Sequence, residues 1–521
     1  MSESKNPSNN ENQSTTTNEY SDRQRKLQEL RDQGVQAYRE KFERNYTTAE
    51  ALEFSKNTTP RALEEIVASP NTTVKLAGRL MLLRPHGKLT FGHLKDHTGR
   101  IQICFMQDFL GVEAYKMLKK IDLGDFIGVT GELFITKHGE ATLLVKQYEL
   151  LSKTLRPLPE KFHGLEDTET KYRYRYLDLL SDDQTWQRFK FRTSLIKEIR
   201  SFLDQHGFDE IETPILTSIA SGAAAKPFET HHNALDIPMY LRIAPETYLK
   251  RAIVGGYDRV YEFAKCFRNE GIDPSHLQEF TMLEYYASYW NYQDNMDFTE
   301  RMIKHVLKTL LGTLKVELVD REGQKQSIDF SNEWPRLNFV ELIKGDCGID
   351  ILDHYGDAPA LLSAIKAKGI QIEKGHTMGY GNLCDALYKK VSRPKLIQPC
   401  FVINHPVDTK PLARRNDQDA RLADTFQLLV NTWEVINAYS ELVDPLDQRA
   451  RLEGQAAAKD AGDEEAMPMD EDYIYAMEHG MPPMSGWGMG IDRFTALLTN
   501  QDNLKDTVLF PIMRPLDHHA E

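Results

Sequence analysis

The strongest constraint on the fold of this chain is the alternation of side chains in residues 279–289, which read EFTMLEYYASY. Because a β-strand projects alternate residues to opposite faces, Phe280, Glu284 and Tyr286 share one face of the predicted strand. Phe280 and Glu284 then stand about 13 Å apart along that face. An aromatic ring and a carboxylate at this spacing suit a ligand with a planar base at one end and a cation at the other. A half-buried strand that binds no ligand is the alternative interpretation.

A second predicted strand repeats this arrangement of polar groups. In the segment NAYSEL, Asn437, Tyr439 and Glu441 occupy alternate positions and therefore share a face. Upstream, Glu246 ends the segment RIAPE. Any one of these acids, taken alone, is more typical of a structural ion-pair network than of a binding pocket.

Composition limits the classes of protein to which the chain can belong. At roughly 150 residues per domain, its 521 residues predict two to four domains. No apolar run approaches the roughly 18 residues of a membrane span. The formal net charge of −14 argues against a general nucleic-acid-binding protein, because non-specific binding depends on Lys and Arg contacts to phosphates. Any RNA contact would therefore use a local basic patch, such as residues 23–44.

The cysteines and the N-terminal residues indicate the cellular compartment in which the protein is expected. The 5 cysteines contain no CxxC pair, which argues against a zinc site and a disulfide scaffold and fits a reducing cytoplasm. The first residues are rich in Ser, Asn and Thr and resemble neither a secretory signal nor a transit peptide. Their polarity predicts a disordered tail. The sequence thus predicts a cytoplasmic protein without a membrane segment.

Changes in sequence texture predict the domain boundaries. Short alternating strands punctuated by glycines predict a small closed five-stranded barrel, with the OB-fold favoured and an SH3-like barrel as the alternative. The segment LRPLP after it predicts a stiff linker. The predicted parts are a disordered tail at 1–20, a helical segment at 21–72, the barrel at 73–152, the linker at 153–172, and a second domain at 173–517 with a helical insertion at about 345–395.

The second domain begins with a predicted amphipathic helix. Residues 195, 196, 199, 202 and 203 are apolar and lie on one face at helical spacing. Gly207 is predicted to end this helix with a left-handed cap. Residues 208–214 then continue as a predicted strand.

Two arginine-bearing stretches lie far apart in the sequence. Residues 267–270 read FRNE and are followed by His276, while residues 486–493 read GWGMGIDR. In this order they resemble motifs 2 and 3 of the class II aminoacyl-tRNA synthetases. The predicted helix, Gly207 and the predicted strand at residues 195–214 resemble motif 1. The likeness to the bacterial-type lysyl-tRNA synthetases runs from about residue 23 to residue 515.

This resemblance implies both a fold and an assembly. The implied fold class is α+β multidomain, in which an N-terminal OB-fold barrel precedes a class II catalytic domain made of an antiparallel sheet flanked by helices. In that family motif 1 forms the dimer interface, so a homodimer is implied as well.

The resemblance also implies a lysine–tRNA ligase. Such an enzyme joins L-lysine to ATP with release of pyrophosphate and then transfers the lysyl group to the 3′-terminal ribose of tRNA(Lys). Arg268 and Arg493 are the implied catalytic residues, since a guanidinium group can bind phosphate and carboxylate oxygens where charge builds up. The implied lysine-binding residues are Gly222, Glu246, Arg268, Glu284, Tyr286, Asn437, Tyr439 and Glu441. The implied ATP-binding residues are Arg268, Glu270, His276, Phe280, Glu434, Gly488, Gly490 and Arg493.

Mg²⁺ is the implied cofactor, and no zinc is expected. The family supplies two acids as ligands at positions that match Gln427 and Glu434, so this chain departs from the pattern at Gln427. An amide oxygen can ligate Mg²⁺ but brings no charge. Strict alternation also places Glu434 and Asn437 on opposite faces of their strand, and both can face the site only if a β-bulge lies between them.

The barrel is implied to read the anticodon of the tRNA. Phe91, Gln102 and Glu140 match the positions that stack on and hydrogen-bond to U-rich anticodon bases, which is how OB-folds recognise single-stranded RNA. The alternative is that Phe91 fills the interior of the barrel.

Two other functions compete with the lysine–tRNA ligase. An aspartyl- or asparaginyl-tRNA synthetase shares the barrel and the motifs, but an acidic substrate would call for basic residues where Glu246, Glu284 and Glu441 stand. An inactive RNA-binding paralogue with an OB-fold is the other alternative. The presence of Arg268 and Arg493 argues against it, while Gln427 keeps it open.

Overall fold

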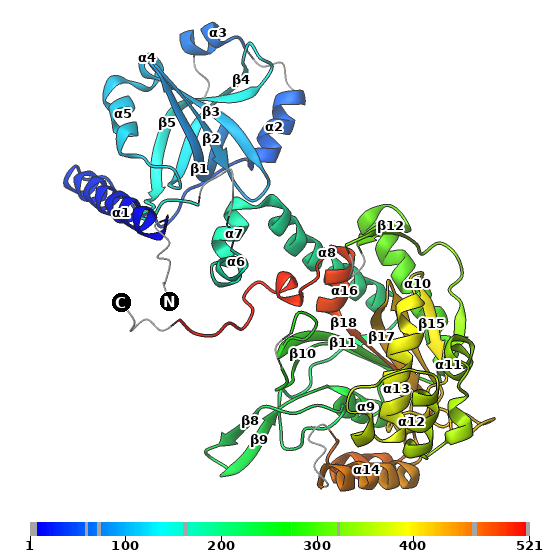
Figure 1. Cartoon of the computed structure of the whole chain (residues 1–521). Coiled ribbons are helices and arrows are strands. Elements are labelled where there is room, and N and C mark those ends of the chain that lie inside the picture. The colour runs from blue at the N-terminus through cyan, green and yellow to red at the C-terminus, as the bar shows by residue number, and fades with distance from the viewer. Residues whose placement is uncertain are drawn as a thin grey trace, which may run out of the picture. The chain divides into compact units, whose positions relative to one another are not determined.

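The computed structural model describes residues 8–57, 61–69, 74–159, 165, 167–271, 273–319, 323–460 and 466–516. The chain divides into two compact units, Met1–Gly164 and Leu165–Glu521 (Figure 1). Among the residues described, no helix is long and apolar enough to cross a membrane.

The first unit is built around a closed five-stranded barrel with the strand order β1-β2-β3-β5-β4. Two short helices, α4 (Gln107–Leu110) and α5 (Val112–Met117), lie between β3 and β4 in the chain. The predicted barrel is therefore confirmed. Its strands are β1 (Val74–His86), β2 (Leu89–Lys95), β3 (Arg100–Met106), β4 (Phe126–Ile135) and β5 (Ala141–Ser152).

Side-chain alternation sorts the barrel residues into an interior and an outer layer. Ile103 and Phe105 of β3 are buried in the main barrel core. Cys104, between them, belongs to a separate cluster that also contains Ile66 of α3 (Leu63–Ala68). Phe91 packs at the edge of this second cluster and is partly exposed. It therefore does not fill the barrel interior.

The N-terminal segment differs from the predicted disordered tail at 1–20. Helix α1 (Ser8–Asp32) is already formed at Ser8, while residues 1–7 lie outside the described residues. Leu27 and Leu30 anchor the helix in the barrel core. The helix extends from this anchor into a polar segment, which composition alone could not show. A further helix, α2 (Thr48–Asn57), follows before the barrel.

The connection between the units begins later than the predicted linker at 153–172. Lys153 is buried and its ammonium donates a hydrogen bond to Asp125 at 2.8 Å. At the other end, α6 (Thr168–Arg173) is already helical. The buried ion pair joins residues distant in the sequence, so the change in texture after the barrel did not reveal that residue 153 belongs to it.

An eight-stranded sheet with the order β14-β15-β16-β17-β18-β11-β10-β6 forms the centre of the second unit. Neighbouring strands are antiparallel except at the pairs β14–β15 and β10–β6. The strands are β6 (Asp209–Glu210), β10 (Arg259–Phe267), β11 (Glu279–Ser288), β14 (Arg336–Asn338), β15 (Cys400–Ile403), β16 (Thr425–Val430), β17 (Trp433–Ser440) and β18 (Met484–Gly490).

Three helices share a continuous apolar core with this sheet: α8 (Asp183–Gln205), α10 (Tyr292–Leu311) and α16 (Ile491–Leu498). Leu283 and Tyr285 of β11 point into this core, so the opposite parity, which includes Glu284, points away from it. The predicted division of this strand into two faces is confirmed.

The predicted motif 1 forms as expected at its turn. Helix α8 ends at Gln205, and Gly207 follows with a φ of +74°, where an L side chain would be strained. The chain then enters β6, which pairs with β10 in parallel.

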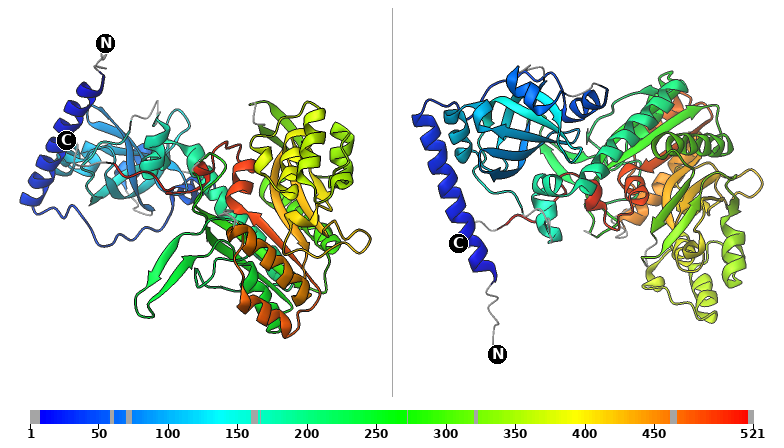
Figure 2. Two further views of the ribbon diagram at one scale, coloured as in Figure 1. Left: turned by 60° about the horizontal axis from the view of Figure 1, so that its bottom comes forward. Right: turned by 90° about the horizontal axis from the view of Figure 1, so that it is seen from above.

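The insertion predicted at about 345–395 is helical. Its helices α11 (Phe339–Cys347), α12 (Ala358–Ala367) and α13 (Tyr380–Val391) share a core with residues of β15 and β16. A small sheet of β7 (Leu216–Thr217), β8 (Glu229–His232) and β9 (Ile237–Leu241) projects from the unit (Figure 2). The remaining elements are α7 (Arg175–Ser181), α9 (Glu246–Val254), β12 (Lys315–Val319), β13 (Lys325–Asp329), α14 (Pro445–Asp460) and α15 (Glu471–Glu478).

Candidate active site

A row of paired residues crosses four neighbouring strands on the face of the sheet that points away from the helical core. Glu284 of β11 pairs with Gly488 of β18, which pairs with Asn437 of β17, and Asn437 pairs with Gln427 of β16. Directly paired residues project to the same face, and neighbouring strands lie about 4.8 Å apart. Glu284 and Asn437 thus stand about 10 Å apart with a glycine between them. The row forms a groove with polar walls.

The next row, Tyr286–Gly486–Tyr439, deepens this groove. A Cβ atom at Gly486 would lie 2.1 Å from Oε1 of Glu441 and 2.4 Å from the ring of Tyr286. No side chain fits there, so the glycine is required by the close approach of its neighbours. Gly486 therefore makes space between two strands that carry the polar groups.

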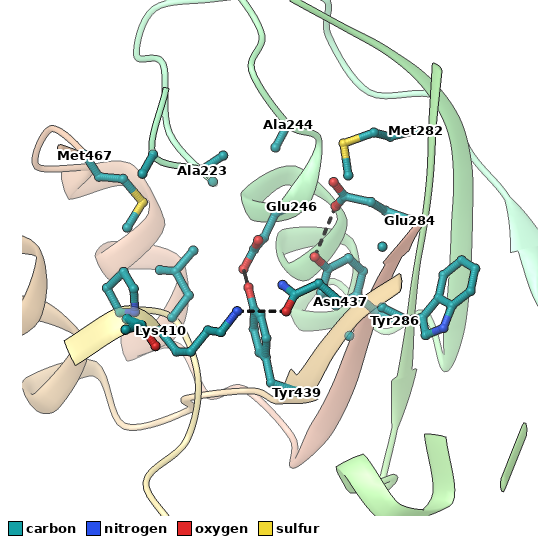
Figure 3. Close-up of a pocket in the computed structure, with 18 of the residues that line it drawn as sticks. Ala223, Ala244, Glu246, Met282, Glu284, Tyr286, Lys410, Asn437, Tyr439 and Met467 are labelled. Atoms are coloured by element: carbon teal, nitrogen blue, oxygen red, sulfur yellow. Dashed lines mark hydrogen bonds between the residues drawn. The ribbon is translucent and has the colours of Figure 1, made fainter. Parts of the chain in front are cut away.

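A cavity of about 250 Å³ occupies the groove. Figure 3 shows side chains from several segments of the chain converging on it. Seven of the eight residues predicted to bind lysine line this cavity, and Glu441 does not. The seven are Gly222, Glu246, Arg268, Glu284, Tyr286, Asn437 and Tyr439.

Glu284 is an acid that lines this cavity and forms no ion pair among the described residues. Its side chain is buried, and the hydroxyl of Tyr286 donates a hydrogen bond to it at 3.2 Å. Burial, reinforced by the nearby Glu246, raises the pKa of Glu284 to about 8. No Lys, Arg or His of the described residues forms an ion pair with it. A ligand with an ammonium group would place a positive charge beside the carboxyl group of Glu284 and so favour its ionised form.

The predicted cage of three acids requires a correction, because the single ammonium of Lys250 already pairs with two of them. Lys250 is fully buried and pairs with Glu246 at 2.6 Å and also with Glu441. Although burial alone would lower the pKa of Lys250, the two carboxylates raise it well above its usual value. Glu246 still lines the cavity and accepts a hydrogen bond from Tyr439 at 2.7 Å. Glu441, whose Oε1 lies 2.1 Å from the position that a Cβ of Gly486 would take, does not line the cavity.

Sequence reasoning missed Lys250, although one signal was present. Glu246 and Lys250 are four residues apart on helix α9 (Glu246–Val254), the spacing at which opposite charges meet on a helix. The contact with Glu441 joins segments far apart in the chain, and only the folded structure shows it.

Gly222 approaches the cavity closely, as predicted. It has a φ of +90°, and a Cβ atom there would lie 3.2 Å from Cβ of Glu246. The absent side chain lets the backbone of this loop line the cavity directly.

A second cavity of about 250 Å³ adjoins the first. Arg268 lies over the ring of Phe280 at 5.1 Å, and Nη1 of Arg493 donates a hydrogen bond to the backbone oxygen of Glu434 at 3.1 Å. His276 is half exposed on the loop between β10 and β11, with Nδ1 2.8 Å from Asp273. All eight residues predicted to bind ATP line this cavity: Arg268, Glu270, His276, Phe280, Glu434, Gly488, Gly490 and Arg493.

Four residues line both cavities: Arg268, Met282, Asn437 and Gly488. We call this boundary the junction. Nε of Arg268 is buried there and has no hydrogen-bond partner among the described residues. A ligand in the first cavity can therefore meet a ligand in the second beside an arginine with unused donor capacity.

The β-bulge that the predicted site requires is present. The pairing of β16 with β17 shifts by one residue between positions 428 and 429, which leaves Val435 as the extra residue. Glu434 and Asn437 consequently both line the second cavity.

The predicted metal ligands do not come together as a two-acid site. Glu434 lines the second cavity, but Gln427 lines neither cavity, and its Oε1 lies 3.2 Å from Nε2 of His405. Within the described part of the chain, no group of three or more His, Cys, Asp or Glu could hold a metal ion. One acid and one engaged, uncharged amide do not fit a metal ion held by paired protein carboxylates.

On the barrel, Phe91 lies on β2 and Gln102 on the neighbouring strand β3, while Glu140 lies in the loop between β4 and β5. Phe91 pairs with Cys104, and two residues further along β2, His93 pairs with Gln102. Gln102 donates a hydrogen bond to Glu140 at 2.7 Å. An aromatic ring and a polar pair thus share the outer face of the barrel.

Comparison with known proteins agrees with both units. Residues 167–514 match the family of class II tRNA synthetases (D, K and N), and residues 74–151 match the OB-fold nucleic acid binding domain. The chain belongs to the class II tRNA synthetases.

Similar proteins within this family carry one name. A lysine–tRNA ligase of Carboxydothermus hydrogenoformans is 47% identical over 94% of this chain and 97% of its own length. Those of Pelotomaculum thermopropionicum and Lactococcus lactis subsp. cremoris are 45% and 44% identical, over 95% and 94% of this chain and 94% and 97% of their own lengths.

One acid ties the three motifs of this class II synthetase together. Asp492 of α16 accepts a hydrogen bond from the backbone N–H of Thr281 on β11 at 2.8 Å and pairs with Arg192 of α8 at 2.7 Å. Sequence reasoning gave Asp492 no role, although it precedes Arg493 directly. The contact holds the start of α16 against β11, and so positions Arg493 at the second cavity.

Proposed function

We propose that this chain is a lysine–tRNA ligase, which activates L-lysine with ATP to lysyl-adenylate and then transfers the lysyl group to the 3′-terminal ribose of tRNA(Lys). The observation that carries the proposal is Glu284, a buried acid without a cation at the wall of a cavity that meets a second cavity at Arg268. The names of the similar proteins agree with this assignment.

In the first step a carboxylate oxygen of lysine attacks the α-phosphorus of ATP. A bond forms between that oxygen and phosphorus, the bond to the bridging oxygen breaks, and pyrophosphate leaves with the electron pair. Because the nucleophile is already an anion, the step transfers no proton and needs no general base. It needs fixed positive charge where negative charge accumulates, and Arg268 at the junction supplies it.

The lysine ammonium would lie at Glu284 and Tyr286, with Glu246, Asn437 and Tyr439 completing the wall of the first cavity. The backbone at Gly222 would approach the α-amino end. Glu441 would act at a distance, by holding Lys250 in place.

The nucleotide would lie in the second cavity. Phe280 would stack on the adenine and Glu270 would hydrogen-bond to it, while Arg493 and His276 would lie near the outer phosphates. Mg²⁺ would enter as the counter-ion of the ATP phosphates, where Glu434 can offer it one carboxylate. Gln427 has no place in this scheme, because it lines neither cavity.

The barrel would bind the anticodon through Phe91, Gln102 and Glu140. Support comes from the match to the OB-fold nucleic acid binding domain and from the shared outer face of these residues. We also propose a cytoplasmic location, where ATP and tRNA are found.

We further propose a homodimer through motif 1. Ile215, which follows the segment of motif 1, and Leu216, the first residue of β7, are large apolar residues with 45% and 48% of their surface exposed. Exposed apolar side chains next to each other fit a protein interface.

An ATP–pyrophosphate exchange assay with each of the twenty amino acids tests the function. We expect exchange with lysine and with no other amino acid at comparable concentration. Exchange with aspartate or asparagine would favour an aspartyl- or asparaginyl-tRNA synthetase. No exchange with any amino acid would favour an inactive RNA-binding paralogue.

A further inference from the structure

A second lysine beside the first cavity differs from Lys250 in its surroundings. Lys410 follows the turn Val407–Thr409 and lines the cavity together with Thr409 and Pro411. Its Nζ donates a hydrogen bond to Oδ1 of Asn437 at 2.8 Å. Figure 3 shows the side chain of Lys410 extended toward Asn437.

The ammonium group of Lys410 has unused donor capacity. An ammonium carries three N–H donors, and Asn437 accepts one of them. In the described part of the chain no carboxylate forms an ion pair with Lys410, in contrast to Lys250, which pairs with two. Burial lowers the pKa of Lys410, with only partial compensation from Glu434. An anion bound beside Lys410 would reverse this shift.

The position of Lys410 relates it to the junction. Its acceptor Asn437 lines both cavities, as does Arg268. The two groups of a bound lysine and a bound ATP that must meet at this boundary are the substrate carboxylate and the α-phosphate. An oxyanion bound at the junction would lie near two positively charged groups, the guanidinium of Arg268 and the ammonium of Lys410.

The two predicted metal ligands, Gln427 and Glu434, lie near Lys410 and Asn437, and only Glu434 is an acid. Gln427 directly pairs with Asn437 across the strands and is neutral, and Glu434 is the acid that most attracts Lys410. The ammonium of Lys410 thus lies close to the position where a second metal-binding acid would be expected and Gln427 stands instead. Fixed positive charge stabilises developing negative charge in a site whether an ion or a side chain carries it.

We propose that Lys410 is an oxyanion-binding residue of the activation step, which contacts the substrate carboxylate or the α-phosphate at the junction and supplies charge there that a protein-held metal ion would otherwise supply. This inference rests on the proposed function of the two cavities. Lys410 keeps its protons throughout and acts by charge and hydrogen bonding alone.

The test compares three variants of the full-length protein. Lys410→Met removes the charge and keeps the length of the side chain, and Lys410→Arg keeps the charge. Lys395→Met is the matched control, because Lys395 is an exposed lysine that pairs with Asp346 at 2.7 Å and lines neither cavity. Thermal melting of each variant shows whether the fold is retained.

In lysine-dependent pyrophosphate exchange we expect Lys410→Met to lower kcat by on the order of 10²-fold, as for other fixed oxyanion donors. Lys410→Arg should recover part of this loss, and Lys395→Met should match the parent protein. An unchanged rate in a folded Lys410→Met variant would overturn the proposal.

Binding measurements by calorimetry, without turnover, distinguish the two oxyanions. If Lys410 contacts the substrate carboxylate, Lys410→Met weakens binding of lysine but not of lysinamide, which lacks the carboxylate. If it contacts the α-phosphate, lysine binding is unchanged and binding of ATP weakens. Unchanged affinity for all three ligands would count against Lys410. These measurements decide the role of Lys410 even if exchange with lysine fails in the parent protein, which would instead refute the proposed function.

Discussion

The two cavities of the catalytic unit are similar in size but differ in how their walls are built. The first is lined by buried charged side chains, of which Glu246 pairs with Lys250, while Glu284 and Lys410 form no ion pair among the described residues. The second is lined in part by a loop, on which His276 is 52% exposed. Charge in the first cavity is desolvated before a ligand arrives, whereas part of the second remains hydrated. This difference predicts that the first cavity decides which amino acid is accepted.

The largest effect is expected for Glu284→Gln. This variant keeps the shape of the first cavity but cannot pair with an ammonium, a loss on the order of 2–5 kcal/mol. At about 1.4 kcal/mol per tenfold, lysine-dependent exchange should fall by roughly 30- to 4,000-fold while ATP still binds. Glu279→Gln, an exposed acid at the start of the same strand, is the control. Normal exchange by Glu284→Gln would remove Glu284 from the amino-acid site.

Arg268→Ala tests the junction that both cavities share. Because Arg268 lines both, its loss should affect the chemical step and not one ligand alone, with a fall in kcat on the order of 10²–10³-fold. Arg421→Ala, which breaks a surface pair with Asp419, should have no such effect. Single-turnover formation of the adenylate measures this step, and an unchanged rate would reject the role of Arg268.

Phe91→Ala should leave both cavities intact and act on the tRNA alone. Loss of one stacked base costs about 1–3 kcal/mol, so charging of tRNA(Lys) should weaken by roughly 5- to 150-fold. Phe126→Ala, which removes another exposed aromatic residue of the barrel, is the control. Adenylate formation should not change. An equal fall in both activities would contradict the assignment of the barrel to the anticodon.

A change of one pH unit is expected to have the smallest effect, and this effect is confined to the first cavity. The pKa of Glu284 is raised to about 8, so below that pH its carboxyl group is mostly neutral in the ligand-free protein. Binding of the lysine ammonium then requires release of a proton, and affinity should fall by up to about tenfold per pH unit below 8. Calorimetry in buffers of different ionisation enthalpy would detect this proton. Lysine affinity independent of pH between 6 and 8 would show that Glu284 does not titrate on binding.

Much of the site could be predicted because it depends on the parity of strand residues. Alternation correctly assigned Glu284 and Tyr286 to the face opposite Leu283 and Tyr285. The same rule showed that Glu434 and Asn437 could both reach the site only through a bulge, and the structure contains one. Parity is a local property of the backbone, so the sequence carries it.

The structure departs from the expected arrangement where the contacts of a residue depend on distant parts of the chain. Glu441 has the parity expected of a pocket residue, yet it is engaged by Lys250. Gln427 has the parity of Asn437 but is bonded to His405. In each case the partner comes from a segment distant in the chain or outside the recognised motif, and a buried charge or amide takes the partner that folding brings to it.

The sequence by itself determined the order of the two units, the faces of the central strands and the family to which the motifs belong, since these follow from local periodicity and from short segments. Only the tertiary structure decided which acids remain without a cation, that Lys410 retains open donors, and where the two cavities meet. The pairing of charges in a low-dielectric interior depends on distances between side chains, and folding alone sets those distances.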